Sequence, residues 1–156
     1  MKLSPNENGQ LDIVMDAAGG VVQETTFETA ILTSLLLNRR ADPEDILPYA
    51  YRGVERGIDA NRQGWVGDIL DEHGRLVGSK IWLLDQEIAV EDTRKRAVEY
   101  VRQALKWAIN HGHVRDIEFN TKYDLTRLDM EVAVFMTNGN VLKLRVNYET
   151  GAVYVI

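Results

Sequence analysis

A glycine-flanked tryptophan and a pair of histidines are the residues of this sequence whose types and spacing could do chemistry. Residues 61–70 read NRQGWVGDIL, so that Trp65 and Asp68 stand among glycines. An indole can bind a ligand, and a carboxylate beside it can act as an acid or a base. The alternative is that Trp65 fills the core while Asp68 caps the turn that begins at Ile69. We favour this second interpretation.

Metal and nucleophile chemistry find less support. His111 and His113 could chelate a metal, but they fall at an expected helix C-terminus, where the helix dipole favours histidine. No carboxylate cluster at ligand spacing accompanies them, so we expect no metal and no cofactor. No serine lies in a nucleophile-elbow context, and no phosphate-binding glycine loop is present. A small cell-wall glycan hydrolase, with acidic residues near Trp65 and Asp68, remains the alternative function.

Composition sets the class of protein. The chain has 156 residues, 45% of them hydrophobic, which fits one folded domain over residues 1–156 with residues 1–10 expected to be flexible. Acidic residues outnumber basic ones, 24 to 18, and the net charge of −6 opposes binding to nucleic acid or to anionic membranes. The absence of cysteine excludes disulfides and thiolate metal sites. Residues 1–10 have no apolar signal-peptide region, and we expect synthesis in the cytoplasm.

The first half of the chain predicts short elements around one apolar helix. Alternation over residues 11–16, a turn at 17–20 and two valines after it predict a small N-terminal hairpin. Thr25 and Glu28 form a capping-box pattern that opens a helix running to about Arg40. Asp42 followed by proline predicts a second, short helix start.

The second half predicts the main framework. Ser79 is expected to cap a short helix over residues 80–84. Apolar spacing predicts a long helix over residues 91–110, ended by Gly112. The remaining residues alternate as strands, with a hairpin at Asn138-Gly139 and a last strand at 153–156. We therefore predict an α+β fold with two main helices and short helices packed on an antiparallel β-meander. A terminal strand with a free edge suggests an interface and not chemistry.

An ordered set of motifs resembles the Mu-like phage and prophage baseplate protein family. The set runs over residues 27–35 (FETAILTSL), 39–41 (RRA), 45–48 (DILP), 64–68 (GWVGD), 78–84 (GSKIWLL) and 100–105 (YVRQAL). The resemblance covers residues 11–148. That family is related to the lysozyme-like baseplate wedge proteins, which act as sheath initiators in contractile tails.

The resemblance implies a structural, non-enzymatic part of a virion tail baseplate, assembled in the host cytoplasm. Its implied partners are other wedge proteins and the tail sheath protein, which adds strands to a sheet edge. Wedge proteins carry a Glu-Pro-Arg contact after the long helix. Here that junction reads His113-Val114-Arg115, so the implied contact rests on the arginine. The expected interface residues are Arg115, Trp65, Asp68, Val153, Tyr154 and Val155, and self-association of the isolated chain stays open.

Overall fold

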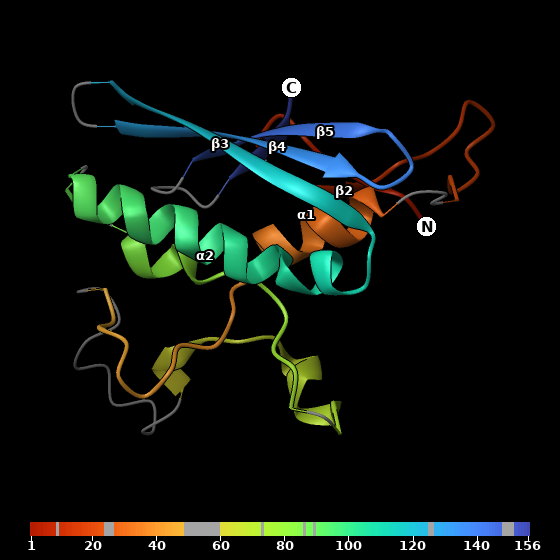
Figure 1. Ribbon diagram of the computed structural model, residues 1–156. Coiled ribbons are helices and arrows are strands. Elements are labelled where there is room, and N and C mark those ends of the chain that lie inside the picture. Colours follow the sequence, from red (N-terminus) through yellow and green to blue (C-terminus); the bar gives the residue numbers. More distant parts are fainter. Residues whose placement is uncertain are drawn as a thin grey trace.

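The molecule has three layers, and its α+β class agrees with the prediction. The computed structural model describes residues 1–8, 10–23, 27–48, 60–72, 74–85, 87–88, 90–124, 127–147 and 152–156. Figure 1 shows a sheet on one side of the two helices and the described parts of residues 40–78 on the other side. The elements are β1 (Leu3–Pro5), β2 (Leu11–Ile13), α1 (Glu28–Leu36), η2 (Ala60–Arg62), η3 (Val66–Leu70), η4 (Lys80–Leu84), α2 (Glu91–Asn110), β3 (Val114–Asp124), β4 (Arg127–Met136), β5 (Val141–Asn147) and β6 (Val153–Val155).

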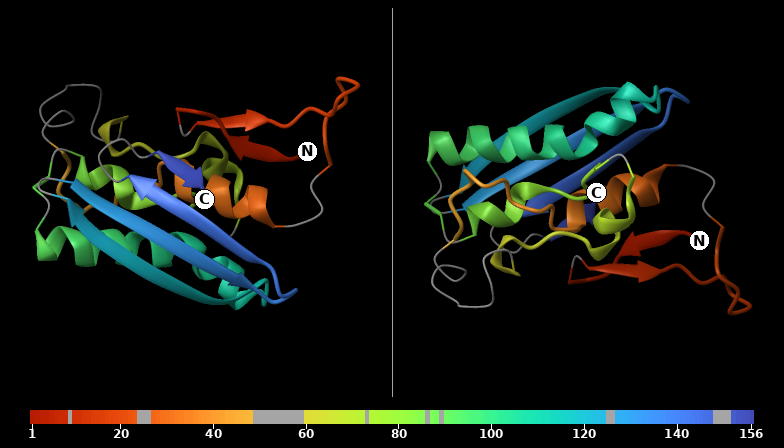
Figure 2. Two further views of the ribbon diagram at one scale, coloured as in Figure 1. Left: turned by 90° about the horizontal axis from the view of Figure 1, so that it is seen from above. Right: turned by 90° about the horizontal axis from the view of Figure 1, so that it is seen from below.

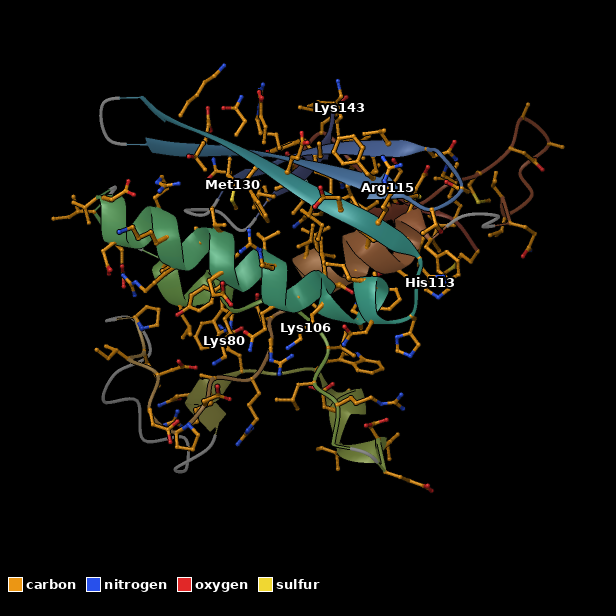
Figure 3. The ribbon with its side chains drawn as sticks, viewed as in Figure 1. Lys80, Lys106, His113, Arg115, Met130 and Lys143 are labelled. Atoms are coloured by element: carbon orange, nitrogen blue, oxygen red, sulfur yellow. The ribbon has the colours of Figure 1, made fainter. Side chains whose placement is uncertain are left out.

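The main sheet is the predicted antiparallel meander, in the order β3-β4-β5-β6. Because side chains alternate along a strand, one face is apolar and covers the helices, while the other is polar and exposed. Met130 is fully buried toward the helices, whereas Lys143 lies exposed on the other face (Figure 3). The Asn138-Gly139 hairpin is confirmed, and Gly139 has the positive φ of +89° that such a turn requires.

Helix α2 begins and ends where its sequence predicts. Its buried stripe, which packs under the sheet, consists of Thr93, Ala97, Val101, Ala104, Leu105 and Ala108. On its exposed face Arg96 pairs with Asp92 at 3.2 Å, and Arg94 pairs with Glu91. Gly112 follows with φ of +72°, the left-handed conformation that ends many helices.

Helix α1 is shorter than predicted, because it ends at Leu36 and not near Arg40. The next residues leave the helix to pair with the residue before η4. The Ser79 amide donates to the Leu37 carbonyl at 2.8 Å, and the Arg39 amide donates to the Ser79 carbonyl at 3.0 Å. Gly78 permits this approach, since a Cβ there would lie 2.4 Å from the Leu37 oxygen. At the other end Phe27 is the N-terminal flanking residue, and Thr25 lies outside the described residues.

The helix predicted to start at Asp42 is a single turn. The Asp45 amide donates to the Asp42 carbonyl at 3.0 Å, and the described residues that follow, 46–48, are not helical. The Asp45 carboxylate accepts from the Asp42 amide at 2.7 Å, which is the reverse of the expected cap. These two aspartates instead share a lysine from η4, as described below. In contrast, the cap of η4 is confirmed, because the Ser79 hydroxyl accepts from the Ile81 amide at 3.3 Å.

The N-terminal unit forms two small pairings. The predicted hairpin is present as a single bridge between Met15 and Val21. In addition β2 pairs with β1, and β1 is a strand that the sequence analysis did not predict. The unit is attached to α1 by a hydrogen bond from the Leu3 amide to the Thr29 hydroxyl at 3.0 Å. Strand β1 lies alongside β6, at one margin of the main sheet (Figure 2).

Candidate interaction surfaces

Residues 65–70 form an exposed apolar cluster on the side of the molecule opposite the sheet (Figure 1). We call Trp65, Val66, Ile69 and Leu70 the η3 cluster. Trp65 is 46% exposed and Ile69 is 84% exposed, so the prediction that Trp65 fills the core is wrong. The indole folds over Gly67 instead, where a Cβ would lie 2.2 Å from its ring. Gly67 therefore makes room for the Trp65 indole, but at the surface of the molecule and not in its core.

Carboxylates hold the backbone below the η3 cluster. The Asp68 Oδ1 accepts from the Val77 amide at 3.0 Å, a cross-link over nine residues, instead of capping the turn at Ile69. Asp71 accepts from the Arg75 amide at 2.6 Å and pairs with its guanidinium. Both acids thus accept hydrogen bonds that shape the loop.

A buried ion triplet fastens the same segment to the helices. Lys80 is only 4% exposed, beneath α2 (Figure 3), and its Nζ lies 2.5 Å from Asp42 and 2.6 Å from Asp45. The neighbouring Trp82 indole donates to the Arg39 carbonyl at 2.8 Å. A buried ammonium is tolerated only when paired and hydrogen-bonded, which these two carboxylates achieve.

The charges of this triplet shift the pKa values of the groups around it. Burial acts to lower the pKa of Lys80, but hydrogen bonds and charge attraction from Asp42 and Asp45 outweigh it, so the pKa is raised. The pKa of Tyr100 is also raised, first by burial and then by the negative charge of Asp45. Lys80 thus keeps its positive charge, as a structural fastening requires.

Sequence reasoning missed this triplet, although one signal was present. Lys80 is the first residue of a short helix, and the four residues that follow it are all apolar. A helix that is apolar all round is buried, so the Lys80 side chain should also lie near the core. Nothing in the sequence identified its partners, which lie 35 and 38 positions away. The bridge between Asn38 and Ser79 brings the two stretches together in the folded chain.

The junction between α2 and β3 is a second candidate surface. The His113 ring stacks on Phe27 at 3.7 Å between centroids, and the Trp107 indole donates to the Ser34 hydroxyl at 2.9 Å. These contacts fasten both ends of α1 to the end of α2 and the residues just after it. Arg115 follows, exposed, at the start of β3 (Figure 3), so its guanidinium is available to a neighbour.

The two edges of the main sheet differ. Strand β6 has three residues: Val153 is fully buried, Tyr154 is half-buried and Val155 is 49% exposed. Its outer side faces β1. Strand β3 has eleven residues, and within the described part of the chain no strand pairs with its outer side.

The described residues contain no group of three or more histidine, aspartate or glutamate side chains placed to hold a metal. Within the same residues, no helix is both long and apolar enough to cross a membrane. His111 and His113 lie with ring centroids 6.3 Å apart, and the His111 Nδ1 lies 2.8 Å from the Trp107 carbonyl oxygen. The pair therefore belongs to the aromatic packing of the helix end.

Comparison with known proteins places the chain in a family. The model of the family described as "Phage protein GP46" matches residues 27–141. The chain is 32% identical, over 136 residues, to "Baseplate protein gp46" of Escherichia phage Mu, and the match covers 86% of each chain. It is 23% identical to "Mu-like prophage FluMu protein gp46" of Haemophilus influenzae, over 85% of this chain and 84% of the relative. The chain therefore belongs to the phage GP46 family, the Mu-like baseplate family that its motifs resemble.

Proposed function

We propose that this chain is a structural subunit of the baseplate of a Mu-like contractile tail, and within it a wedge or sheath-initiator subunit. The observation that carries the proposal is the match to "Baseplate protein gp46" of phage Mu over 86% of both chains. Its place is the tail of the virion, after assembly in the bacterial cytoplasm. Its partners are other baseplate proteins and the tail sheath protein, and it works by contact without turnover.

The η3 cluster supports a contact role. Its apolar side chains lie within six consecutive residues, and Val66, Ile69 and Leu70 are each more than three-quarters exposed. Burying one such side chain against a partner contributes roughly 1.5–3 kcal/mol. Because Asp68 fixes the backbone beneath, little conformational entropy is lost when a partner docks. An apolar cluster on a rigid support is the kind of surface that marks protein interfaces.

Sheet edges and the α2–β3 junction provide the other contacts of the proposal. Edge strands offer unpaired backbone groups, to which a neighbouring chain can add a strand. Strand β3 offers the longer edge, while Val155 and Tyr154 mark the shorter one on β6. Arg115, exposed beside the packed His113, is suited to pair with a carboxylate of a neighbouring subunit.

No observation favours the glycan-hydrolase alternative. A glycosidase needs two carboxyl groups free to act on opposite sides of a scissile bond. Near Trp65, Asp68 accepts a backbone hydrogen bond and Asp71 is paired with Arg75. A peptidoglycan-release assay with the purified chain separates the two functions, since clear turnover lost in Asp68→Asn with the fold intact would favour the enzyme.

Complementation of a phage or prophage that lacks this chain tests the proposal. We expect the deletion to yield particles without normal baseplates and sheathed tails by negative-stain electron microscopy. Ile69→Asp should reproduce this defect. Ile88→Asp is the matched control, because Ile88 is 81% exposed, close to the 84% of Ile69, but lies before α2. Normal sheathed tails in the deletion would contradict the proposed function.

A further inference from the structure

The exposed face of β3 carries a row of side chains with opposite charges at its two ends. Glu118, Asn120 and Lys122 all lie on this face, opposite Ala133, Glu131 and Asp129 of β4. Along the strand the row therefore reads negative, neutral, positive. Its outer backbone edge has no strand partner in the described part of the chain.

The described side chains form no ion pair at either end of this row. Glu118 lies opposite Ala133 and has no cross-strand counterion, whereas Lys122 lies opposite Asp129 of β4. The centre of the face is different. There Asn120 donates to Glu131 at 3.2 Å, and Arg145 of β5 lies 3.4 Å from the same carboxylate. The carboxylate that lacks a cross-strand counterion thus lies on the open edge.

We propose that this edge pairs with β3 of a second copy of the chain, antiparallel and centred on Asn120. In that register each Glu118 lies opposite the Lys122 of the other copy, so two opposite-charge pairs flank the symmetry axis. Directly opposed charges of unlike sign stabilise an antiparallel pair, whereas like charges destabilise it. The contact is isologous, as in most homodimers.

The other face of the strand and its ends fit the same register. Phe119, half-buried with the Arg102 guanidinium 5.4 Å from its ring, comes opposite Thr121 of the second copy, which adds apolar cover to the open side of the ring. The ladder ends near Asp116, where the bulge between Val114 and Asp116 bends β3.

The dimer would seal the longest open edge of the free chain before assembly, and a partner subunit would have to displace it. Long open edges are otherwise sites of aggregation. This inference concerns the isolated chain and does not depend on the proposed baseplate role.

Sedimentation equilibrium of four versions of the purified chain tests the register. Wild type should self-associate into a dimer. Glu118→Lys and Lys122→Glu should each weaken it roughly tenfold or more, because each turns both attractive pairs into like-charge pairs. The double variant Glu118→Lys/Lys122→Glu should recover wild-type dimerisation. Lys143→Glu, on β5 of the same face, is the charge-matched control and should leave the dimer unchanged.

A disulfide provides a second test that does not depend on charge. The chain has no cysteine, so Asn120→Cys introduces a single thiol at the proposed symmetry axis. Directly opposed residues in an antiparallel pair are close enough for a disulfide, and mild oxidation should cross-link this variant. Lys122→Cys should not cross-link, since its own counterpart lies four residues away along the ladder.

Two results would overturn the proposal: a wild type that stays monomeric at every concentration, or a double variant that stays as weak as the single ones. Cross-linking of Lys122→Cys in preference to Asn120→Cys would also refute the register. None of these results bears on tail assembly in the complementation experiment, so the baseplate role would stand or fall separately.

Discussion

Replacing Lys80 by methionine tests how the segment between the helices is held. Methionine keeps a long apolar side chain but removes the ammonium that lies between Asp42 and Asp45. Removing one partner of a fully buried ion pair costs about 3–5 kcal/mol. Asp42 is half exposed and can regain water, so chiefly Asp45, one-fifth exposed, is left with an unmet charge. We therefore expect the free energy of unfolding to fall by about 2–3 kcal/mol.

Urea unfolding followed by circular dichroism at neutral pH measures this loss. A fall of that size moves the unfolding midpoint by roughly 1–2 M urea, with an unchanged slope. Lys106→Met is the control, because Lys106 is exposed on α2 (Figure 3) and its replacement should change stability by less than about 0.5 kcal/mol. Equal midpoints for Lys80→Met and Lys106→Met would refute the idea that the triplet fastens the segment.

The pH dependence of the free energy of unfolding tests whether the Lys80 ammonium stabilises the folded state. The pKa of Lys80 is raised above its ordinary value of 10.5, so the folded state holds this proton more tightly than the unfolded state. Its contribution is fully present below pH 10.5 and is lost as the pH rises through the folded pKa. The stability difference between wild type and Lys80→Met should therefore stay constant through neutral pH and narrow in strong base. A difference that widens there would contradict the assigned cause.

Two further comparisons test the packing. Trp65→Ala should lower the free energy of unfolding in urea by about 1 kcal/mol, because half of the side chain is already in water. Trp82→Ala should lower it by about 3–5 kcal/mol, because Trp82 is buried and hydrogen-bonded to Arg39. Equal losses would show that Trp65 carries core packing. Val146→Pro should lower the thermal midpoint far more than Lys143→Gln, since proline removes a ladder donor from β5, which pairs on both sides; similar midpoints would mean that β5 contributes little to the stability of the sheet.

The sequence predicted the elements whose periodicity is strong and local. Helix α2 repeats its apolar spacing over twenty residues, and the strands after it alternate around an Asn-Gly turn. Such patterns are decided by near neighbours along the chain, so they can be read without the rest of the fold. The sheet order follows because short turns join consecutive antiparallel strands.

What sequence reasoning missed depends on contacts between distant stretches. The end of α1 is decided by Ser79, about forty residues away, and the turn at Asp42 by the lysine that follows Ser79. The glycines around Trp65 suit a core residue, because they let the backbone pass close to the indole, and no local pattern indicates that this loop lies on the surface. The opposite charges of Glu118 and Lys122 indicate pairing with a second copy only because β3 is an edge strand, and the position of a strand in its sheet depends on the whole fold.

The bridge between Asn38 and Ser79 closes the excursion of residues 39–78 at its base. The two ends of this segment therefore lie together beneath α2, and the η3 cluster extends from a closed base. Loops with closed bases tolerate insertion and replacement well, because a change in their length costs the framework little. A chimera that exchanges residues 39–78 for the equivalent stretch of a relative, with Asp42, Asp45 and Gly78 retained, should therefore keep its scaffold while acquiring a different docking surface.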